Sequence, residues 1–230
     1  MLRHNIVAGV YPDGLLPGEA ELMVAYGARR AAVREALSML RRERLVERVQ
    51  GIGTFSICEQ RYASTFEEMH GHVDADAVSR RARPQILERA VIAAPDAVAH
   101  KLGIAPGEPV VLLEYLGFVD GVAVWLASNY VKLPQGAPLL AAAFESEWYA
   151  LLASAGLRVG GSEWHLSAVN VDDAVAELLD VPSGTAVMLA EELIWDEQGE
   201  VYDFAVCYFR SDRHCFVSAA GRFAMREASA

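Results

Sequence analysis

The chain is poor in cysteine and in long apolar runs, and these absences exclude several classes of protein. It has three cysteines in 230 residues (Cys58, Cys207 and Cys215), an odd number without the spacing of metal ligands. No apolar run reaches the roughly 18 residues that a membrane span needs. The first ten residues lack the basic start, apolar core and cleavage site of a signal peptide. We therefore expect a cytoplasmic protein with reduced cysteines and no membrane partner.

The sequence also lacks the residue patterns that catalysis usually requires. It contains no nucleophile–base pair, no metal triad and no phosphate-binding glycine loop. His100, His165 and His214 are isolated from one another and fit structural roles. His70 and His72 could form a metal pair on a strand, but no third ligand lies nearby. We predict no catalytic residue, no metal and no cofactor.

Charge is distributed unevenly along the chain. The net charge is −11, yet residues 1–57 carry eight arginines, no lysine and six acidic residues, which leaves +2. Residues 58–230 carry −13. An acidic surface repels nucleic acid, so any contact with a polyanion must be confined to the front of the chain.

Two short helices are predicted at the front. Residues 16–22 (LPGEAEL) place Pro and Gly at a helix entry and carboxylates in the first turn, and Gly27 ends this helix. A second helix begins near Arg29. Its apolar residues recur at helical spacing and form one buried stripe, and the arginines lie on another face. The stripe is Val33, Ala36, Leu37 and Leu40, and the arginines are Arg29, Arg30, Arg34 and Arg41. This pattern predicts a helix-turn-helix.

A β-hairpin is predicted directly after these helices. Residues 45–49 and 54–57 alternate in polarity like strands, and Gly51-Ile52-Gly53 forms the turn between them. A hairpin in this position is a wing, whose glycines let the backbone approach a phosphate while Thr54 donates its hydroxyl. The alternative is a solvated charged helix followed by an ordinary hairpin, and the combination of three signals at these spacings disfavours it.

These residues carry a resemblance to a known family. The segments LPGEAEL (16–22), VREAL (33–37), LVER (45–48) and QGIGTF (50–55) resemble the winged-helix domain of GntR-type bacterial transcription regulators, and the likeness covers residues 2–57. The resemblance implies that Arg30 and Arg34 read the major groove, while the wing glycines and Thr54 approach the minor groove or backbone. The chain departs from the family at Ala20, where an arginine is usual, and at Arg29, where a small polar residue is usual.

The predicted DNA-binding set follows from this comparison. It comprises Arg29, Arg30, Arg34, Gly51, Gly53 and Thr54.

The rear of the chain contains an internal repeat after a linker. Residues 58–85 lack sustained apolar periodicity and form the predicted linker between a DNA-binding domain (1–57) and a second domain (86–230). Residues 96–99 (DAVA) recur at 173–176, an offset of 77 that continues through the following turn and strand. Each copy predicts a short helix, a turn and a hairpin, the first turning at Asp120-Gly121. We therefore predict an α+β domain with an antiparallel sheet and internal pseudosymmetry.

This second domain resembles the UTRA domain of the HutC subfamily of GntR regulators, over about residues 86–220. The resemblance rests on the helix, the PGEPV turn (106–110), the DG hairpin and the segment YFRSDR (208–213). It implies a chorismate-lyase-like fold with a small-molecule pocket between the hairpins. The implied effector-binding residues are Tyr115, Gly117, Ser146, Asp203, Phe209 and Arg210.

The effector is not expected to be a simple sugar phosphate. Members that bind phosphosugars commonly have an Arg-x-Arg where this chain reads Tyr115-Leu116-Gly117. Two missing guanidiniums forfeit charge-assisted hydrogen bonds worth roughly 1.5–3 kcal/mol each. An aromatic floor of Tyr115, Trp148 and Phe209, with Asp203 and Glu114, would suit an uncharged or cationic ligand. Alternatively these aromatic residues pack the core, and Asp212-Arg213 is a structural ion pair.

Three functions fit the sequence. The leading one is a homodimeric, ligand-responsive regulator that binds double-stranded operator DNA. Because repression is commoner in the family that the chain resembles, we expect a repressor. The second is a constitutive DNA-binding protein whose rear domain only dimerises. The third is a chorismate-lyase-like enzyme, which the missing catalytic patterns disfavour.

Overall fold

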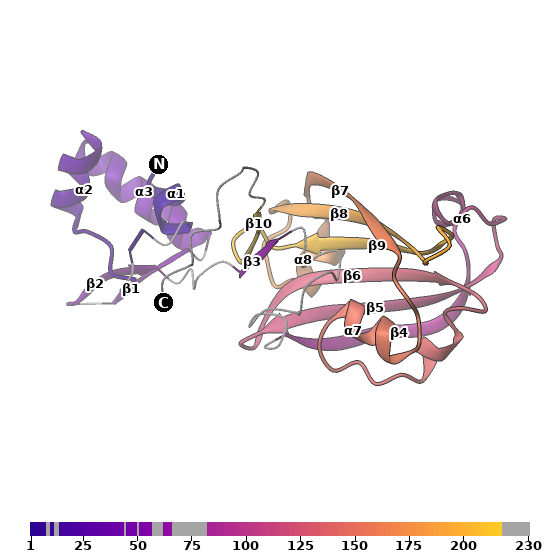
Figure 1. The fold of residues 1–230 in the computed structure, drawn as a ribbon. Coiled ribbons are helices and arrows are strands. Elements are labelled where there is room, and N and C mark those ends of the chain that lie inside the picture. The colour runs from indigo at the N-terminus through magenta and orange to yellow at the C-terminus, as the bar shows by residue number, and fades with distance from the viewer. Residues whose placement is uncertain are drawn as a thin grey trace, which may run out of the picture.

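The chain folds into two modules, seen at opposite ends of Figure 1. The computed structural model describes residues 1–7, 10–11, 14–43, 45–49, 51–56, 62–65 and 82–217. Cys58, His70 and His72 lie outside these residues, as does most of the predicted linker. The front module is a winged helix-turn-helix and the rear module is an antiparallel sheet with helices, so the predicted α+β architecture is confirmed.

The front module has three helices and a two-stranded wing. Its elements are α1 (Leu2–Val7), α2 (Glu19–Tyr26), α3 (Arg30–Arg42), β1 (Val46–Val49) and β2 (Gly53–Ser56). The side chain of Glu21 accepts a 2.8 Å hydrogen bond from the Gly18 amide at the start of α2. Gly27 ends this helix with φ at +58°, a left-handed conformation that glycine adopts without strain. The predicted helix boundaries therefore have local physical causes.

A small apolar core holds the helices and wing together. Val33, Leu37 and Leu40 of α3 are buried, as their spacing predicts, and pack with Ile6, Leu16, Leu22, Leu45 and Val46. Ala36, the fourth residue of the predicted stripe, is only half-buried at the edge of this stripe. The wing pairs from Val46 with Ser56 to Val49 with Gly53. Residues 14–16 lie against β2, where the Leu16 amide donates to the Thr54 carbonyl at 2.8 Å. The arginine-bearing face of α3 stays outside this core.

The rear module is a six-stranded antiparallel sheet in the order β4-β5-β6-β9-β8-β7. Its strands are β4 (Arg83–Ala93), β5 (Pro109–Val119), β6 (Val122–Lys132), β7 (Gly161–Asn170), β8 (Ala186–Trp195) and β9 (Val201–Phe209). Its helices are α6 (Asp96–Leu102), η1 (Ala137–Leu140), α7 (Trp148–Ser154) and α8 (Asp173–Leu178). The order is symmetric about β6 and β9, and each half consists of a strand, a helix and a hairpin. This arrangement agrees with the internal repeat, which extends to a strand before each helix.

The sheet is covered on both faces. The α7 helix packs on one face with Val111, Leu113 and Tyr115 of β5. On the other face, α6 packs near Val110 and α8 near Leu116. Alternate residues of the central strands therefore enter different cores. The predicted hairpin turn at Asp120-Gly121 is present, with φ of +51° and +79°.

A third, two-stranded sheet joins the linker range to the end of the described chain. In it, β3 (Tyr62–Thr65) pairs in parallel with β10 (His214–Val217), and Figure 1 shows the pair between the two modules. Both β3 and the first residues of β4 fall within the range predicted as linker, 58–85. Short polar strands of this kind have too few alternating apolar positions to be predicted.

Candidate DNA-reading surface and effector site

The predicted DNA-reading arginines are exposed at the start of α3. Arg29 is the N-cap residue of the helix, and Arg30 begins its first turn. The side chains of Arg30 and Arg34 are 69% and 65% exposed, so neither takes part in the core. Spacing of i and i+4 places these two on one helix face. This surface can present two guanidinium groups to a partner.

An acidic residue of the neighbouring helix lies between these two arginines. Oε2 of Glu19, the first residue of α2, is 3.7 Å from Arg30 Nε, and Oε1 is 3.6 Å from Arg34 Nε. Sequence reasoning placed Glu19 only as a first-turn carboxylate. Its contact with α3 depends on how the two helices cross, which periodicity alone does not specify.

The predicted wing residues surround an exposed turn. Gly51 has φ of +79°, and Ile52 at the tip is 69% exposed. A Cβ on Gly53 would lie 2.7 Å from Leu15 Cδ1, so a side chain there would displace the exposed Leu15 side chain that packs beside the wing. Thr54 is half-buried on β2. Gly51 therefore serves the turn and Gly53 the packing of the wing.

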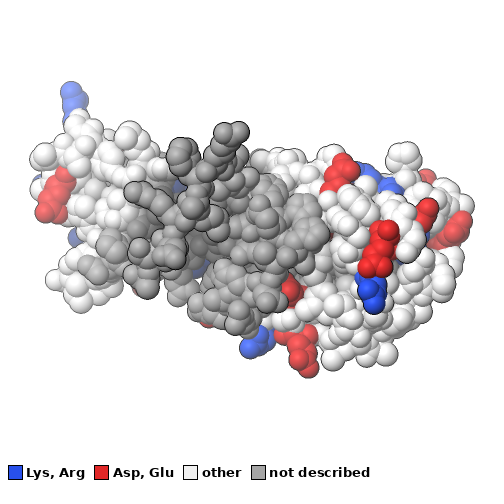
Figure 2. Space-filling view, in the orientation of Figure 1, with Lys and Arg blue, Asp and Glu red and all other residues white. Residues whose placement is uncertain are grey.

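The charge of the rear module differs from that of the arginine surface. Figure 2 shows acidic side chains toward the end of the sheet domain farthest from the front module. Described acidic residues of this domain that stand exposed include Asp96, Glu108, Glu177 and Glu200. A polyanion that approached this end would be repelled.

A cluster of polar side chains occupies the sheet face under α7. Asp203 of β9 and Glu192 of β8 are 0% and 3% exposed. Glu192 pairs with Ala205 and Asp203 with Ile194, so the two carboxyl groups are diagonal neighbours on adjacent strands and share a face. Asn129 of β6, also paired with Ala205, lies in the same row. Burying this many polar groups is costly unless they have partners.

The α7 helix supplies partners for both carboxyl groups. The Trp148 indole donates a 2.7 Å hydrogen bond from Nε1 to Asp203 Oδ2. The Tyr149 hydroxyl donates to Glu192 Oε1 and lies 3.1 Å from Ser162 Oγ of β7. A short helix thus positions two aromatic donors over two carboxyl groups.

Burial shifts the ionisation of both acids toward the neutral form. It raises the pKa of Asp203 to about 8, and the hydrogen bond from Trp148 opposes part of this rise. It also raises the pKa of Glu192 well above its ordinary value, in part opposed by the bond from Tyr149 and increased by the nearby Asp203 charge. Burial therefore favours the protonated form of both carboxyl groups, which can donate as well as accept.

Several buried polar atoms of this region have no hydrogen-bond partner among the described residues. They include Asp203 Oδ1, Asn129 Nδ2, Tyr202 Oη, and Nε and Nη2 of Arg89 on β4. Arg89 pairs with Leu113, which pairs with Asn129, so Arg89 lies in the same row across the sheet. Its Nη1 donates to the Ala142 carbonyl at 2.8 Å. Unpaired buried polar atoms are rare, and several on one face indicate a place for water or a ligand.

Four of the six predicted effector residues share this face. Tyr115 stacks on Trp148 with ring centroids 6.3 Å apart and meets the Phe144 edge at 4.6 Å. Phe209 lies farther along, 6.3 Å from the Trp125 ring. The others on this face are Gly117 and Asp203. Glu114, which the sequence prediction grouped with Asp203, does not join them: it lies on the opposite face and accepts a 2.7 Å bond from Ser128.

Gly117 has a packing role in this structure. A Cβ at this position would lie 2.0 Å from Cε2 of Trp125, its cross-strand partner. The indole therefore covers the glycine backbone. The same arrangement recurs at Gly161, where a Cβ would lie 2.8 Å from the Trp195 ring.

Ser146 lies outside the polar cluster, next to an open cavity. It precedes α7 and lines a cavity of about 380 Å³ with residues of the 142–154 segment. Ala142, the partner of Arg89, lines the same cavity. Ala142 therefore lies between this cavity and the Arg89 side chain.

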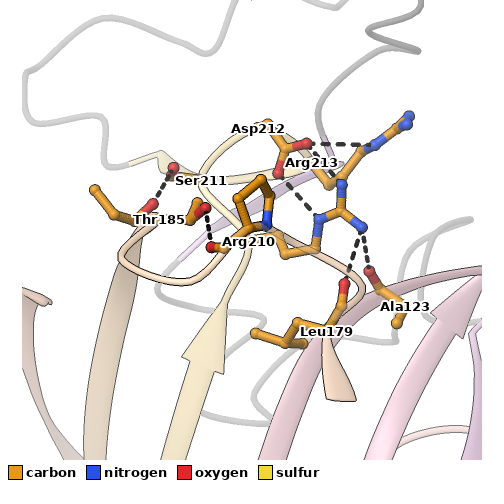
Figure 3. A network of polar contacts seen from close by, with 9 residues as sticks. Ala123, Leu179, Thr185, Arg210, Ser211, Asp212 and Arg213 are labelled. Carbon is orange, nitrogen blue, oxygen red and sulfur yellow. Dashed lines mark hydrogen bonds and ion pairs between the residues drawn. The ribbon is translucent and has the colours of Figure 1, made fainter. Parts of the chain in front are cut away.

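Arg210 lies apart from this face, in a polar network beyond the end of β9 (Figure 3). Its guanidinium is buried and makes a two-point ion pair with Asp212, at 2.8 and 3.1 Å. It also donates to the Ala123 and Leu179 carbonyls at 3.3 and 3.2 Å. These bonds join β6, α8 and the segment after β9, and Arg213 approaches the same carboxylate at 3.8 Å. This geometry is typical of a structural ion pair that holds neighbouring elements together, which we call the Arg210–Asp212 tie.

Sequence reasoning missed Glu192, Tyr149, Asn129 and Arg89. A signal existed for Glu192, because alternation along β8 places Ala190, Glu192 and Ile194 on the inner face. A carboxylate at an inward position of an apolar strand is a functional candidate. For the other three, the row across the sheet depends on strand order.

Comparison with known proteins identifies both modules. Residues 1–55 match the family model described as bacterial regulatory proteins, gntR family, and residues 77–214 match the UTRA domain. The transcriptional regulator GgaR of Escherichia coli K12 is 26% identical over 221 residues, covering 94% of this chain and 86% of GgaR. The transcriptional repressor NagR of Bacillus subtilis is 24% identical over 211 residues, covering 90% and 85%.

Solved structures show the same fold. PhnF from Mycobacterium smegmatis aligns with a TM-score of 0.63 at 21% identity, covering 91% of this chain and 92% of PhnF. Among the described residues, no helix is long and apolar enough to cross a membrane.

Proposed function

The chain belongs to the gntR family of bacterial regulatory proteins and carries a UTRA domain, and from this premise we propose that it is a ligand-responsive, sequence-specific DNA-binding repressor. Its action on DNA would place it in the cytoplasm. The observation that supports DNA reading most strongly is the exposed Arg30–Arg34 pair on α3, held outside the core of a winged helix-turn-helix. Arginine suits this role because its planar fork matches guanine edges and phosphates.

The remaining predicted contacts belong to the same proposal. Arg29 adds charge at the helix start, and Gly51, Gly53 and Thr54 shape a wing that approaches the DNA backbone. We propose a homodimer, since two copies of a helix-turn-helix read two half-sites of a near-palindrome about one helical turn apart. NagR, which is named a repressor, supports the sign of regulation by similarity.

Gel-shift binding to the region upstream of the chain's own gene tests this part. A complex should form there at a salt concentration at which an unrelated duplex of equal length remains free. Equal retardation of both duplexes would contradict sequence-specific binding.

The effector site in this proposal is the polar face under α7. Asp203 and Glu192 would meet donor groups of the ligand, and Asn129 and Arg89 would meet an acceptor group at its other end. Tyr115 and Trp148 would supply an aromatic surface, with Ser146 at the neighbouring cavity. Gly117 and Phe209 would shape the wall, and Arg210 would hold the module together beyond it.

This set favours a neutral or cationic effector over a simple sugar phosphate. A cation that approaches Asp203 stabilises its charged form, whereas the two carboxyl groups add no positive charge that would hold a dianion. Ligand binding would then favour one arrangement of the two DNA-binding modules, a coupling of about 1–3 kcal/mol.

A thermal-shift screen with three panels (primary amines, neutral sugars and sugar phosphates) tests the effector class. At least one amine or neutral compound should raise the melting temperature, and Asp203→Asn should reduce that shift. Hits confined to sugar phosphates would contradict the proposed class. A chain that responds to no panel would instead favour a constitutive DNA-binding dimer.

A further inference from the structure

Glu19 occupies an unusual place for an acidic residue on a surface that meets a polyanion. Its single carboxylate contacts both arginines of α3, Oε2 with Arg30 and Oε1 with Arg34, at 3.7 and 3.6 Å. The Glu19 side chain is 29% exposed, less than half as much as either arginine. The acid therefore lies inside the contact between α2 and α3, and the arginines extend beyond it.

The charge of the surface around it comes from α3 alone. The α2 helix has the sequence EAELMVAY, with two acids and no basic residue. Next to Glu19, Ala20, Met23 and Val24 line an open hollow together with Arg30. No cation of α2 compensates for the Glu19 charge, so its electrostatic partners on this surface are the two arginines.

Stability does not explain the arrangement. Exposed ion pairs contribute about 0–1 kcal/mol, because water screens them and ordering long side chains costs entropy. An acid here also weakens every contact of this surface with phosphate. A residue that adds little stability and opposes general DNA binding needs another role.

Both contacts are ionic, longer than a hydrogen bond, and involve Nε of the arginines, so they favour one orientation of each side chain while the terminal nitrogens lie farther along it. Arginine has about 2 kcal/mol of rotamer entropy, part of which is lost whenever it binds a fixed partner. If the arginines are already ordered before binding, a sequence-specific complex, which needs one arginine geometry, loses less rotamer entropy when it forms. A non-specific complex, in which arginines follow the phosphates, gains less from the restriction and still meets the repulsion.

We propose that Glu19 is a positioning residue that raises the DNA sequence specificity of the chain. Its carboxylate holds Arg30 and Arg34 for base readout and disfavours sequence-independent phosphate contact. The inference rests on the proposed function, in which these two arginines read DNA.

The test compares Glu19→Gln with Glu35→Gln, an isosteric loss of one charge at an exposed position of α3. Dissociation constants are measured by fluorescence anisotropy for two duplexes of equal length. One is the operator, the upstream duplex that binds in the gel-shift experiment, and the other has a random sequence. Glu19→Gln should weaken operator binding and strengthen random binding, so that the specificity ratio falls by about tenfold, equivalent to 1.4 kcal/mol. Glu35→Gln should strengthen both and leave the ratio unchanged.

Two further measurements separate positioning from other roles. In an Arg30→Ala background, Glu19→Gln should change the ratio less, because one of its two partners is absent. The melting temperature of Glu19→Gln should equal that of Glu35→Gln. If Glu19→Gln strengthens both duplexes as the control does, or weakens both with a lowered melting temperature, the proposal is wrong. A wild-type chain that does not prefer its operator would instead contradict the DNA-reading surface itself.

Discussion

At the scale of single residues, the buried acids of the rear module indicate a functional site more strongly than its aromatic residues do. Tyr115 and Trp148 pack as core residues pack, and their stacking alone does not indicate a ligand. Asp203 is different, because one of its oxygens has a donor in Trp148 and the other has no partner among the described residues. An acid retained in this environment lowers the stability of the fold, which is a common property of functional sites.

The cost of burying Asp203 predicts a specific pH dependence. In the unfolded chain this carboxyl ionises near pH 3.8, whereas in the folded chain its pKa is about 8. The folded state therefore binds more protons between these values, and its stability falls as the pH rises through this window. Glu192 acts in the same direction.

Replacing Asp203 by Asn should remove its part of the slope, since an amide does not ionise and its oxygen still accepts from Trp148. Relative to wild type, Asp203→Asn should gain stability from pH 5 to pH 8 by more than about 1.4 kcal/mol, the equivalent of one pKa unit. Chemical denaturation at both pH values measures this gain. Glu177→Gln, at an exposed position, should follow wild type. A curve for Asp203→Asn parallel to wild type would show that the burial of Asp203 does not govern the slope.

At the scale of elements, the sequence predicts features that depend on neighbouring residues, but it does not predict the order of the strands in the sheet. The caps of α2, the stripe of α3 and the DG turn of the first hairpin are set by neighbouring residues, and each lies where the sequence predicts it. The repeat predicted two matching halves. Strand order was not accessible in the same way, because pairing between β6 and β9 joins segments about 77 residues apart. The row from Arg89 to Glu192 depends on that order.

The β5–β6 hairpin allows a test of whether Gly117 serves packing or the effector. Because a Cβ would lie 2.0 Å from the Trp125 ring, Gly117→Ala should lower the stability by about 1–3 kcal/mol, as overpacking does. In a Trp125→Ala background the same change should cost little, and denaturation of the four variants of this double-mutant cycle measures the coupling. Unchanged stability with a weaker ligand-induced thermal shift would indicate direct contact with an effector instead.

At the scale of the whole molecule, the proposal confines the DNA contact of an acidic chain to one small surface. The net charge is −11, and the front 57 residues alone are net positive. The β3–β10 pair connects the linker range to the end of β9, near the Arg210–Asp212 tie. The face under α7 is therefore continuous along β9 with β10, and β10 pairs with β3 of the linker range.

We propose that the α3 arginines make this chain a reader of DNA sequence, and Arg34→Ala is the decisive variant. The matched control is Arg158→Ala, an arginine of the rear module that is 79% exposed. Affinity for the upstream duplex is measured by titration at fixed salt for wild type and both variants. Arg34→Ala should abolish specific binding, and Arg158→Ala should bind as wild type does. Unchanged affinity of Arg34→Ala would contradict the account.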